Sequence, residues 1–183
     1  LARFSERRRL DIGLRYGQTF LGMIQDLTGV EKAELAGSAR RRRETIGDLD
    51  IVAAVQPQDV ERVTAEILSL NGIADVKGAG DSKVSVILDT SIFEGGFSLG
   101  HLDANVLEAI GGEGYEQLES GGTIDARVRL VPPHVFAFTL AYFTGSKEHN
   151  IRMRQVAQEK GLKLNEFGLM PETELTGLEA AET

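Results

Sequence analysis

The sequence of 183 residues contains no cysteine, which excludes disulfide bonds, thiolate zinc sites and cysteine nucleophiles. It has no apolar run of the roughly eighteen residues that a membrane-spanning helix needs, and no recognisable signal peptide. Its histidines, His101, His134 and His149, are scattered along the chain, so we assign none of them a catalytic role. These absences fit a protein of the reducing cytoplasm without a membrane partner.

Charge is unevenly distributed along the chain. The formal net charge of -8 argues mildly against nucleic-acid binding, but the distribution of charge matters more than the total. Residues 164–183 contain five glutamates and no lysine or arginine, whereas residues 147–163 carry five positive and two negative side chains. A second basic cluster, Arg40 to Arg43, lies in the first third of the chain. We therefore expect two local anion-binding surfaces and an acidic, linker-like tail.

The periodicity of apolar residues predicts alternating strands and helices. Helical spacing is expected over residues 11–27, 57–70, 133–143 and 146–160. Strands are expected over residues 32–37, 48–55, 73–78, 83–88 and 123–131, with a turn and a short strand over 161–169. Repeated glycines make residues 89–122 a loop-rich insertion with one short helix near 102–110. This order predicts a mixed sheet with flanking helices, followed by a small helical unit.

Two aspartates one residue apart are the first candidate for chemistry. Asp48 and Asp50 begin a predicted strand, so their side chains lie on the same face. Neighbouring carboxylates repel each other, and a divalent cation removes that repulsion. The alternative is a solvated turn at the start of a strand. The pair alone does not separate the two interpretations.

A phosphate-binding turn is predicted just before the aspartates. Gly37 and Ser38 follow a predicted strand and offer backbone N–H groups and a hydroxyl, which suit phosphate oxygens. The arginines at 40–43 follow within reach, and a guanidinium can bind phosphate with two hydrogen bonds. Taken separately, the Gly-Ser turn and the arginines could each simply belong to an exposed basic turn. Their combination places phosphate donors and carboxylates at one end of the sheet.

The segment "GSARRRRETIGDLDIV", residues 37–52, resembles the nucleotidyltransferase signature of the family X DNA polymerases, the polymerase beta-like group. A second segment, "YFTGSKEHNIRMRQVAQEKGLKLNEFGL", residues 142–169, is similar to the region that follows the palm in bacterial and archaeal members. The resemblance implies an α/β (α+β) nucleotidyltransferase-type fold. It predicts a helical lead-in over 1–36, a palm over 34–141 with the insertion 89–122, a nucleotide-selection subdomain over 142–170, and a tail over 171–183.

The same resemblance implies roles for individual residues. Asp48 and Asp50 match metal-binding carboxylates, and Arg9 lies roughly where the family has a further triphosphate-contacting arginine. Contact with the incoming nucleotide is implied for Gly37, Ser38, Arg41, Gly47, Tyr142, Phe143, Gly145 and Asn150, and contact with DNA for Lys147 and Arg154. The family has a cis peptide at the bond that corresponds to Gly145–Ser146. Without the motif, Tyr142 and Phe143 would be read as core aromatics.

The third carboxylate departs from the family pattern, which is Asp-x-Arg with a proline five residues after the aspartate. Five residues before Pro132 stands Arg127, whereas Asp125 begins the sequence "DARV". Either two residues are inserted before the prolines and Asp125 is the ligand, or an arginine occupies the ligand position. The strand period places both on one face. We favour Asp125 as the third catalytic and metal-binding residue.

The resemblance implies a DNA-directed DNA polymerase that adds a nucleotide from a dNTP to a primer 3′-hydroxyl, in gap-filling repair. Two divalent ions, Mg²⁺ or Mn²⁺, would be held by Asp48, Asp50 and Asp125 and by the triphosphate. The implied partners are gapped or primed DNA and dNTP, bound by a cytoplasmic monomer. The alternatives are a template-independent nucleotidyltransferase, which residues 142–154 disfavour, and a catalytically silent DNA-binding module, which the irregular third carboxylate allows.

Overall fold

The computed structural model describes residues 7–80, 82–93 and 122–171. Its centre is a five-stranded mixed sheet in the order β2-β4-β7-β6-β5. The strands are β2 (Val30–Leu35), β4 (Asp48–Val55), β5 (Ile73–Gly80), β6 (Lys83–Asp89) and β7 (Thr123–Val131). β4 and β7 are parallel, and all other neighbours in this sheet are antiparallel. The predicted α/β class with a mixed sheet is confirmed.

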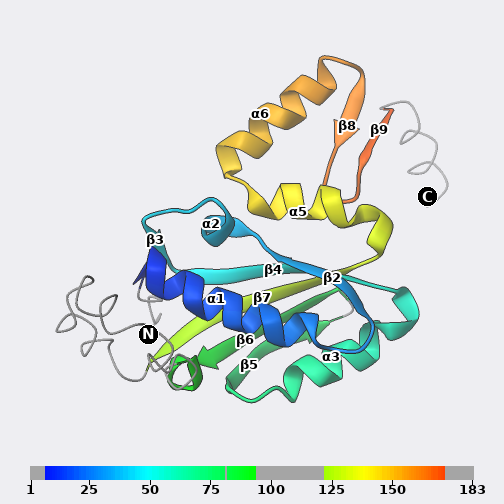
Figure 1. The fold of residues 1–183 in the computed structure, drawn as a ribbon. Helices are drawn as coiled ribbons and strands as arrows, with labels where there is room; N and C mark the ends of the chain where they lie inside the picture. The colour runs from blue at the N-terminus through cyan, green and yellow to red at the C-terminus, as the bar shows by residue number, and fades with distance from the viewer. Residues whose placement is uncertain (1–6, 81, 94–121, 172–183) are drawn as a thin grey trace, which may run out of the picture.

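One face of the sheet packs against two helices, α1 (Leu10–Gln25) and α3 (Val60–Leu68), the latter preceded by the short helix η1 (Pro57–Asp59). Figure 1 shows α1 crossing this face. Alternate strand residues, such as Leu49 and Ile51 of β4, join helix residues such as Phe20 and Ile67 in one buried cluster. Removal of these side chains from water is the main stabilising contribution to the fold.

The opposite face is covered only in part. Val52 and Ala54 in the second half of β4 pack against Phe136 of α5 (Phe136–Thr144), which follows the short helix η4 (Pro133–Val135). Asp48 and Asp50 belong to the same face by strand alternation, but they lie in the first half of β4, before this apolar contact. The open half of the face therefore carries the polar residues of β4.

A small C-terminal part follows α5. It contains α6 (Lys147–Gln158) and a two-stranded sheet of β8 (Leu162–Leu164) and β9 (Leu169–Pro171). Figure 1 shows this part on the far side of α5 from the sheet. Gly145, with φ 68°, ends α5, and the Ser146 hydroxyl accepts a hydrogen bond from the His149 backbone N–H at 3.4 Å to cap α6.

Several local features differ from the sequence predictions. The Gly-Ser turn is a single helical turn, α2 (Gly37–Arg40), and residues 161–169 give two strands rather than one. A two-stranded pair, β1 (Arg8–Arg9) with β3 (Thr45–Ile46), was not predicted. A short helix, η2 (Thr90–Phe93), follows β6, and the helix expected near 102–110 lies outside the described residues. Within the described ranges, no helix is long and apolar enough to cross a membrane.

Candidate nucleotide-binding cleft

The aspartates of β4 face a row of charged residues on β7. In the parallel ladder, Asp48 stands opposite Asp125, and Asp50 stands opposite Arg127. Strand alternation places all four side chains on the half-open face of the sheet. The structure therefore brings Asp125 to the expected edge, but it brings Arg127 there as well.

Arg127 contacts both aspartates of β4. Its Nε lies 3.0 Å from Asp50 Oδ1 in an ion pair, and its Nη2 donates to Asp48 Oδ2. The Arg127 side chain is 45% exposed, while those of Asp48 and Asp50 are 39% and 20% exposed, so the contacts lie in a partly desolvated position. A guanidinium in this position offsets part of the repulsion between the two carboxylates. From the sequence, a metal ion was expected to do this.

Asp125, the favoured third ligand, is engaged elsewhere. Its Oδ1 lies 2.5 Å from Nζ of Lys77 on β5, a strand that is separated from β7 by β6. Within the part of the chain that the structure describes, no group of three or more His, Asp or Glu residues is placed to hold a metal ion. Two of the carboxylates are paired with Arg127, and the third is paired with Lys77. This arrangement does not fit a pair of divalent ions. The metal-binding role of Asp125 stays a prediction.

Asp50 is the most enclosed member of the group. Burial raises the pKa of its carboxyl group above the ordinary value, the charge of Arg127 acts in the opposite direction, and the charge of Asp48 adds to the rise. A Cβ atom on Gly37 would come within 2.5 Å of Asp50 Oδ2, and Gly37 has φ +56°. Only glycine therefore suits this close approach between α2 and β4.

The one-turn helix α2 forms the opposite side of the site. The Ser38 hydroxyl oxygen is buried and makes no hydrogen bond to any described residue. Arg41, which follows α2, donates from Nη1 to the carbonyl oxygen of Thr144, the last residue of α5. A buried hydroxyl that makes no hydrogen bond to a described residue, next to an arginine, is an arrangement that suits an anion.

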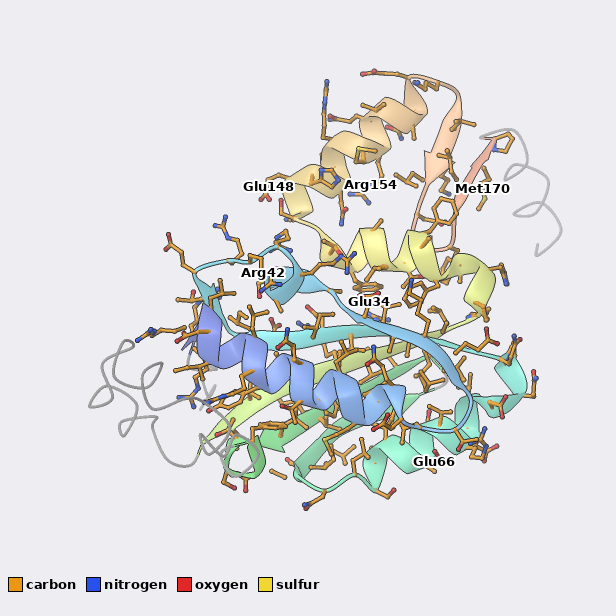
Figure 2. All side chains as sticks on the ribbon, viewed as in Figure 1. Glu34, Arg42, Glu66, Glu148, Arg154 and Met170 are labelled. Carbon is orange, nitrogen blue, oxygen red and sulfur yellow. The ribbon has the colours of Figure 1, made fainter. Side chains whose placement is uncertain are left out.

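A polar cavity of about 630 Å³ joins these elements. It is lined by Arg7, Gly37, Ser38, Arg41, Arg43, Asp48, Asp50, Tyr142, Phe143, Gly145, Ser146, Lys147, Asn150 and Arg154. In Figure 2, Arg154 lies on α6 and Arg42 follows α2, so the two basic segments flank the same region. The structure thus gathers both sequence motifs, which are about a hundred positions apart, around one cavity.

The turn between α5 and α6 has the geometry that the resemblance implies. The Gly145–Ser146 peptide bond is cis. Asn150 donates from Nδ2 to the carbonyl oxygen of Tyr142 at 2.7 Å, which fixes the turn, and the rings of Tyr142 and Phe143 meet edge to face with centroids 5.3 Å apart. Ser146 and Asn150 of this segment line the cavity, and the Asn150 hydrogen bond holds its backbone in place.

Arg7 lines the cavity and was not found from the sequence; it is held by hydrogen bonds to Thr45 at 2.7 and 2.8 Å. Arg43 also lines the cavity, and the sequence had indicated it only as one of the arginines at 40–43. Both residues belong to runs of arginine, which were the signal that the sequence offered for them. Arg9 instead forms an exposed ion pair with Asp11 at 3.2 Å and does not line the cavity. Gly47 lies behind the lining, where a Cβ would come within 3.3 Å of the Arg7 guanidinium.

Comparisons with known proteins agree with this arrangement. The model of the DNA polymerase beta thumb matches residues 139–182. The "DNA polymerase/3'-5' exonuclease PolX" of Bacillus subtilis (strain 168) is 37% identical over 173 residues, which is 94% of this chain. The chain belongs to the family X DNA polymerases. It spans 24% of the length of that relative. The thumb match begins within α5 and includes α6, β8 and β9.

Proposed function

We propose that this family X polymerase segment binds a nucleoside triphosphate in the cavity between the palm and the thumb, next to primed or gapped DNA. One observation carries the proposal. Every residue that the sequence assigned to the nucleotide, with the exceptions of Gly47 and Arg9, lines the same polar cavity. Its volume of about 630 Å³ falls in the range of about 300–1,000 Å³ that is typical of small-molecule sites.

The chemistry of the lining suits the parts of a nucleotide. Ser38 and Arg41 offer a hydroxyl and a guanidinium for phosphate oxygens, and Arg43 and Lys147 add positive charge. Tyr142 and Phe143 present flat aromatic surfaces for the sugar and the base. The phosphates would therefore lie toward α2, and the base would lie toward the start of α6.

DNA binding would rest on α6. This helix carries Lys147 and Arg154, which line the cavity, and Arg152, which is exposed. Contacts between such side chains and DNA phosphates release counter-ions, so the affinity should fall as the salt concentration rises. We propose a single copy of the chain as the binding unit, as expected from the sequence.

Transfer of the bound nucleotide to a primer is the second candidate function. It is supported by the family membership and by the position of Asp125, which lies directly opposite Asp48 and forms a partly exposed ion pair with Lys77. Asp48, Asp50 and Asp125 would be the ligands of Mg²⁺ or Mn²⁺. The contacts of Arg127 do not favour this arrangement, so binding is the function that the geometry supports best.

The two candidates are separated by a pair of measurements on the same chain. A fluorescent dATP analogue is titrated with a gapped duplex present, and extension of a labelled primer is followed with Mg²⁺ or Mn²⁺. We expect saturable nucleotide binding and no extension. Extension that is lost in Asp50→Ala would establish transfer instead. Absence of nucleotide binding would overturn the proposal, whatever the extension assay gives.

A further inference from the structure

Arg127 places a positive charge among carboxylates that were predicted to bind metal ions. Asp48 and Asp50 each direct an oxygen to its guanidinium, so those two oxygens already have a cationic partner. A divalent ion that binds the same two carboxylates would lie next to a fixed positive charge and would have to displace it. The group therefore contains its own cation.

The backbone holds Arg127 at this place. β7 is an inner strand, with β4 on one side and β6 on the other, and Arg127 pairs in register with Asp50 and with Ser85. A shift by one residue would move every buried side chain of β7 to the wrong face, so the register is strongly specified. The side chain can change its rotamer, but its starting point opposite Asp50 is fixed.

The neighbouring charges on the same face of β7 are also engaged. Arg129, one strand period further on, lies over the ring of Phe143 with its guanidinium carbon 4.3 Å from the ring centroid. Asp125, one period before, is paired with Lys77. Among the described residues, Arg127 forms ion pairs with Asp48 and Asp50, and these are the contacts that a metal ion would have to replace.

We propose that Arg127 is a built-in counter-cation that takes the place of divalent ions at Asp48 and Asp50, so that the cavity accepts a nucleotide without a metal ion on its carboxylate side. Without such a cation, the two aspartates would repel the negative phosphates bound near Ser38 and Arg41. The nucleotide part of this inference rests on the proposed function, whereas the metal part does not.

The metal part is tested with Mn²⁺ alone, by electron paramagnetic resonance of the free ion in titrations of the full chain. We expect the wild type to bind Mn²⁺ only weakly, and Arg127→Asp to bind at least about tenfold more tightly, because a third carboxylate replaces the cation opposite Asp50. Arg129→Asp is the matched control, since it changes the charge equally on the same face, one strand period away. We expect less than about a threefold change for it.

Two results would overturn the metal part. One is a wild type that binds Mn²⁺ as tightly as Arg127→Asp. The other is an equal gain in Arg129→Asp, which would reduce the effect to general charge. If Arg127→Asp does not fold, which circular dichroism reports, Arg127→Leu replaces it. This variant removes the cation and adds no ligand, and we expect it to bind Mn²⁺ about threefold or more tightly than the wild type; an unchanged affinity would count against the inference.

The nucleotide part is tested with the fluorescent dATP analogue in EDTA and in Mg²⁺. We expect the affinity of the wild type to differ less than about threefold between the two conditions, and that of Arg127→Leu to fall at least about tenfold in EDTA. Strong Mg²⁺ dependence of the wild type would refute this part. If no protein binds nucleotide in either condition, the proposed function fails, while the Mn²⁺ titration still decides the role of Arg127.

Discussion

At the carboxylate end of the cavity, formed by β4 and β7, Asp48 and Asp50 both contact Arg127, and Asp125 contacts Lys77. At the phosphate end, formed by α2 and the start of α6, the Ser38 hydroxyl is buried without a hydrogen bond to any described residue. The first end satisfies its charges internally. The second end leaves a buried polar group for a partner from outside the described chain.

This difference separates recognition from chemistry. Phosphate binding needs donors that stay available in the folded chain, and at the phosphate end the Ser38 hydroxyl stays available, while Arg41 donates one of its N–H groups to Thr144. Two-metal transfer needs converging carboxylates with room for cations, and Arg127 takes that room. Under the proposed function, the chain therefore has a nucleotide cavity whose two β4 carboxylates are paired with Arg127. The following substitutions test how far the two ends are independent.

The largest effect is expected for Arg41→Ala at the phosphate end. Loss of a charge-assisted hydrogen bond of about 1.5–3 kcal/mol lowers affinity about 10- to 100-fold. Titration of the fluorescent dATP analogue measures it. Arg40→Ala is the control, because Arg40 belongs to α2 but faces Glu34 at 3.4 Å and does not line the cavity. Equal losses in both variants would show that α2 contributes only general positive charge.

Gly37→Ala tests the contact between the two ends. The added Cβ would lie 2.5 Å from Asp50 Oδ2, at a residue with φ +56°, so we expect the free energy of unfolding to fall by about 1–3 kcal/mol. Urea denaturation followed by circular dichroism measures the loss. Gly78→Ala on β5 is the control, since a Cβ there would meet no atom within 4 Å. A stable Gly37→Ala protein would mean that α2 and Asp50 separate easily.

Ser38→Ala is expected to weaken binding of the dATP analogue about three- to tenfold, which corresponds to one neutral hydrogen bond of about 0.5–1.5 kcal/mol. Its free energy of unfolding should stay the same or rise slightly, because the hydroxyl has no hydrogen bond to the described residues. Thermal unfolding without nucleotide provides the second measurement. A loss of stability together with unchanged affinity would assign Ser38 to the fold.

The smallest effect is expected for Lys77→Ala at the carboxylate end. Its side chain is 48% exposed and that of Asp125 is 33% exposed, so removal of the pair should change the free energy of unfolding by less than about 1 kcal/mol. The change should shrink further in high salt. Urea denaturation at two salt concentrations measures it, with Lys83→Ala as the control. A loss of several kcal/mol would mean that Asp125 is held far more firmly than the exposed geometry indicates.

Much of the fold could be predicted from the sequence. The alternation in β4 and β7 and the helical spacing of Phe20 and Ile24 in α1 are local patterns that burial reinforces, so they persist in the structure. The small β1–β3 pair was missed because strands of two residues are too short to show the alternation of apolar and polar residues that predicts a strand. The Gly-Ser turn became a helical turn because its backbone closes onto Asp50, a contact that no local pattern reports.

By itself, the sequence predicted which two segments meet, the signature at 37–52 and the turn at 142–150, and residues of both line one cavity. Only the tertiary structure decided which β7 side chain contacts the aspartates. Both Asp125 and Arg127 share the correct face, so the period of two cannot separate them. The parallel register of β7 beside β4 does, because it sets Arg127 opposite Asp50, while β5 supplies Lys77 to Asp125 from across the sheet.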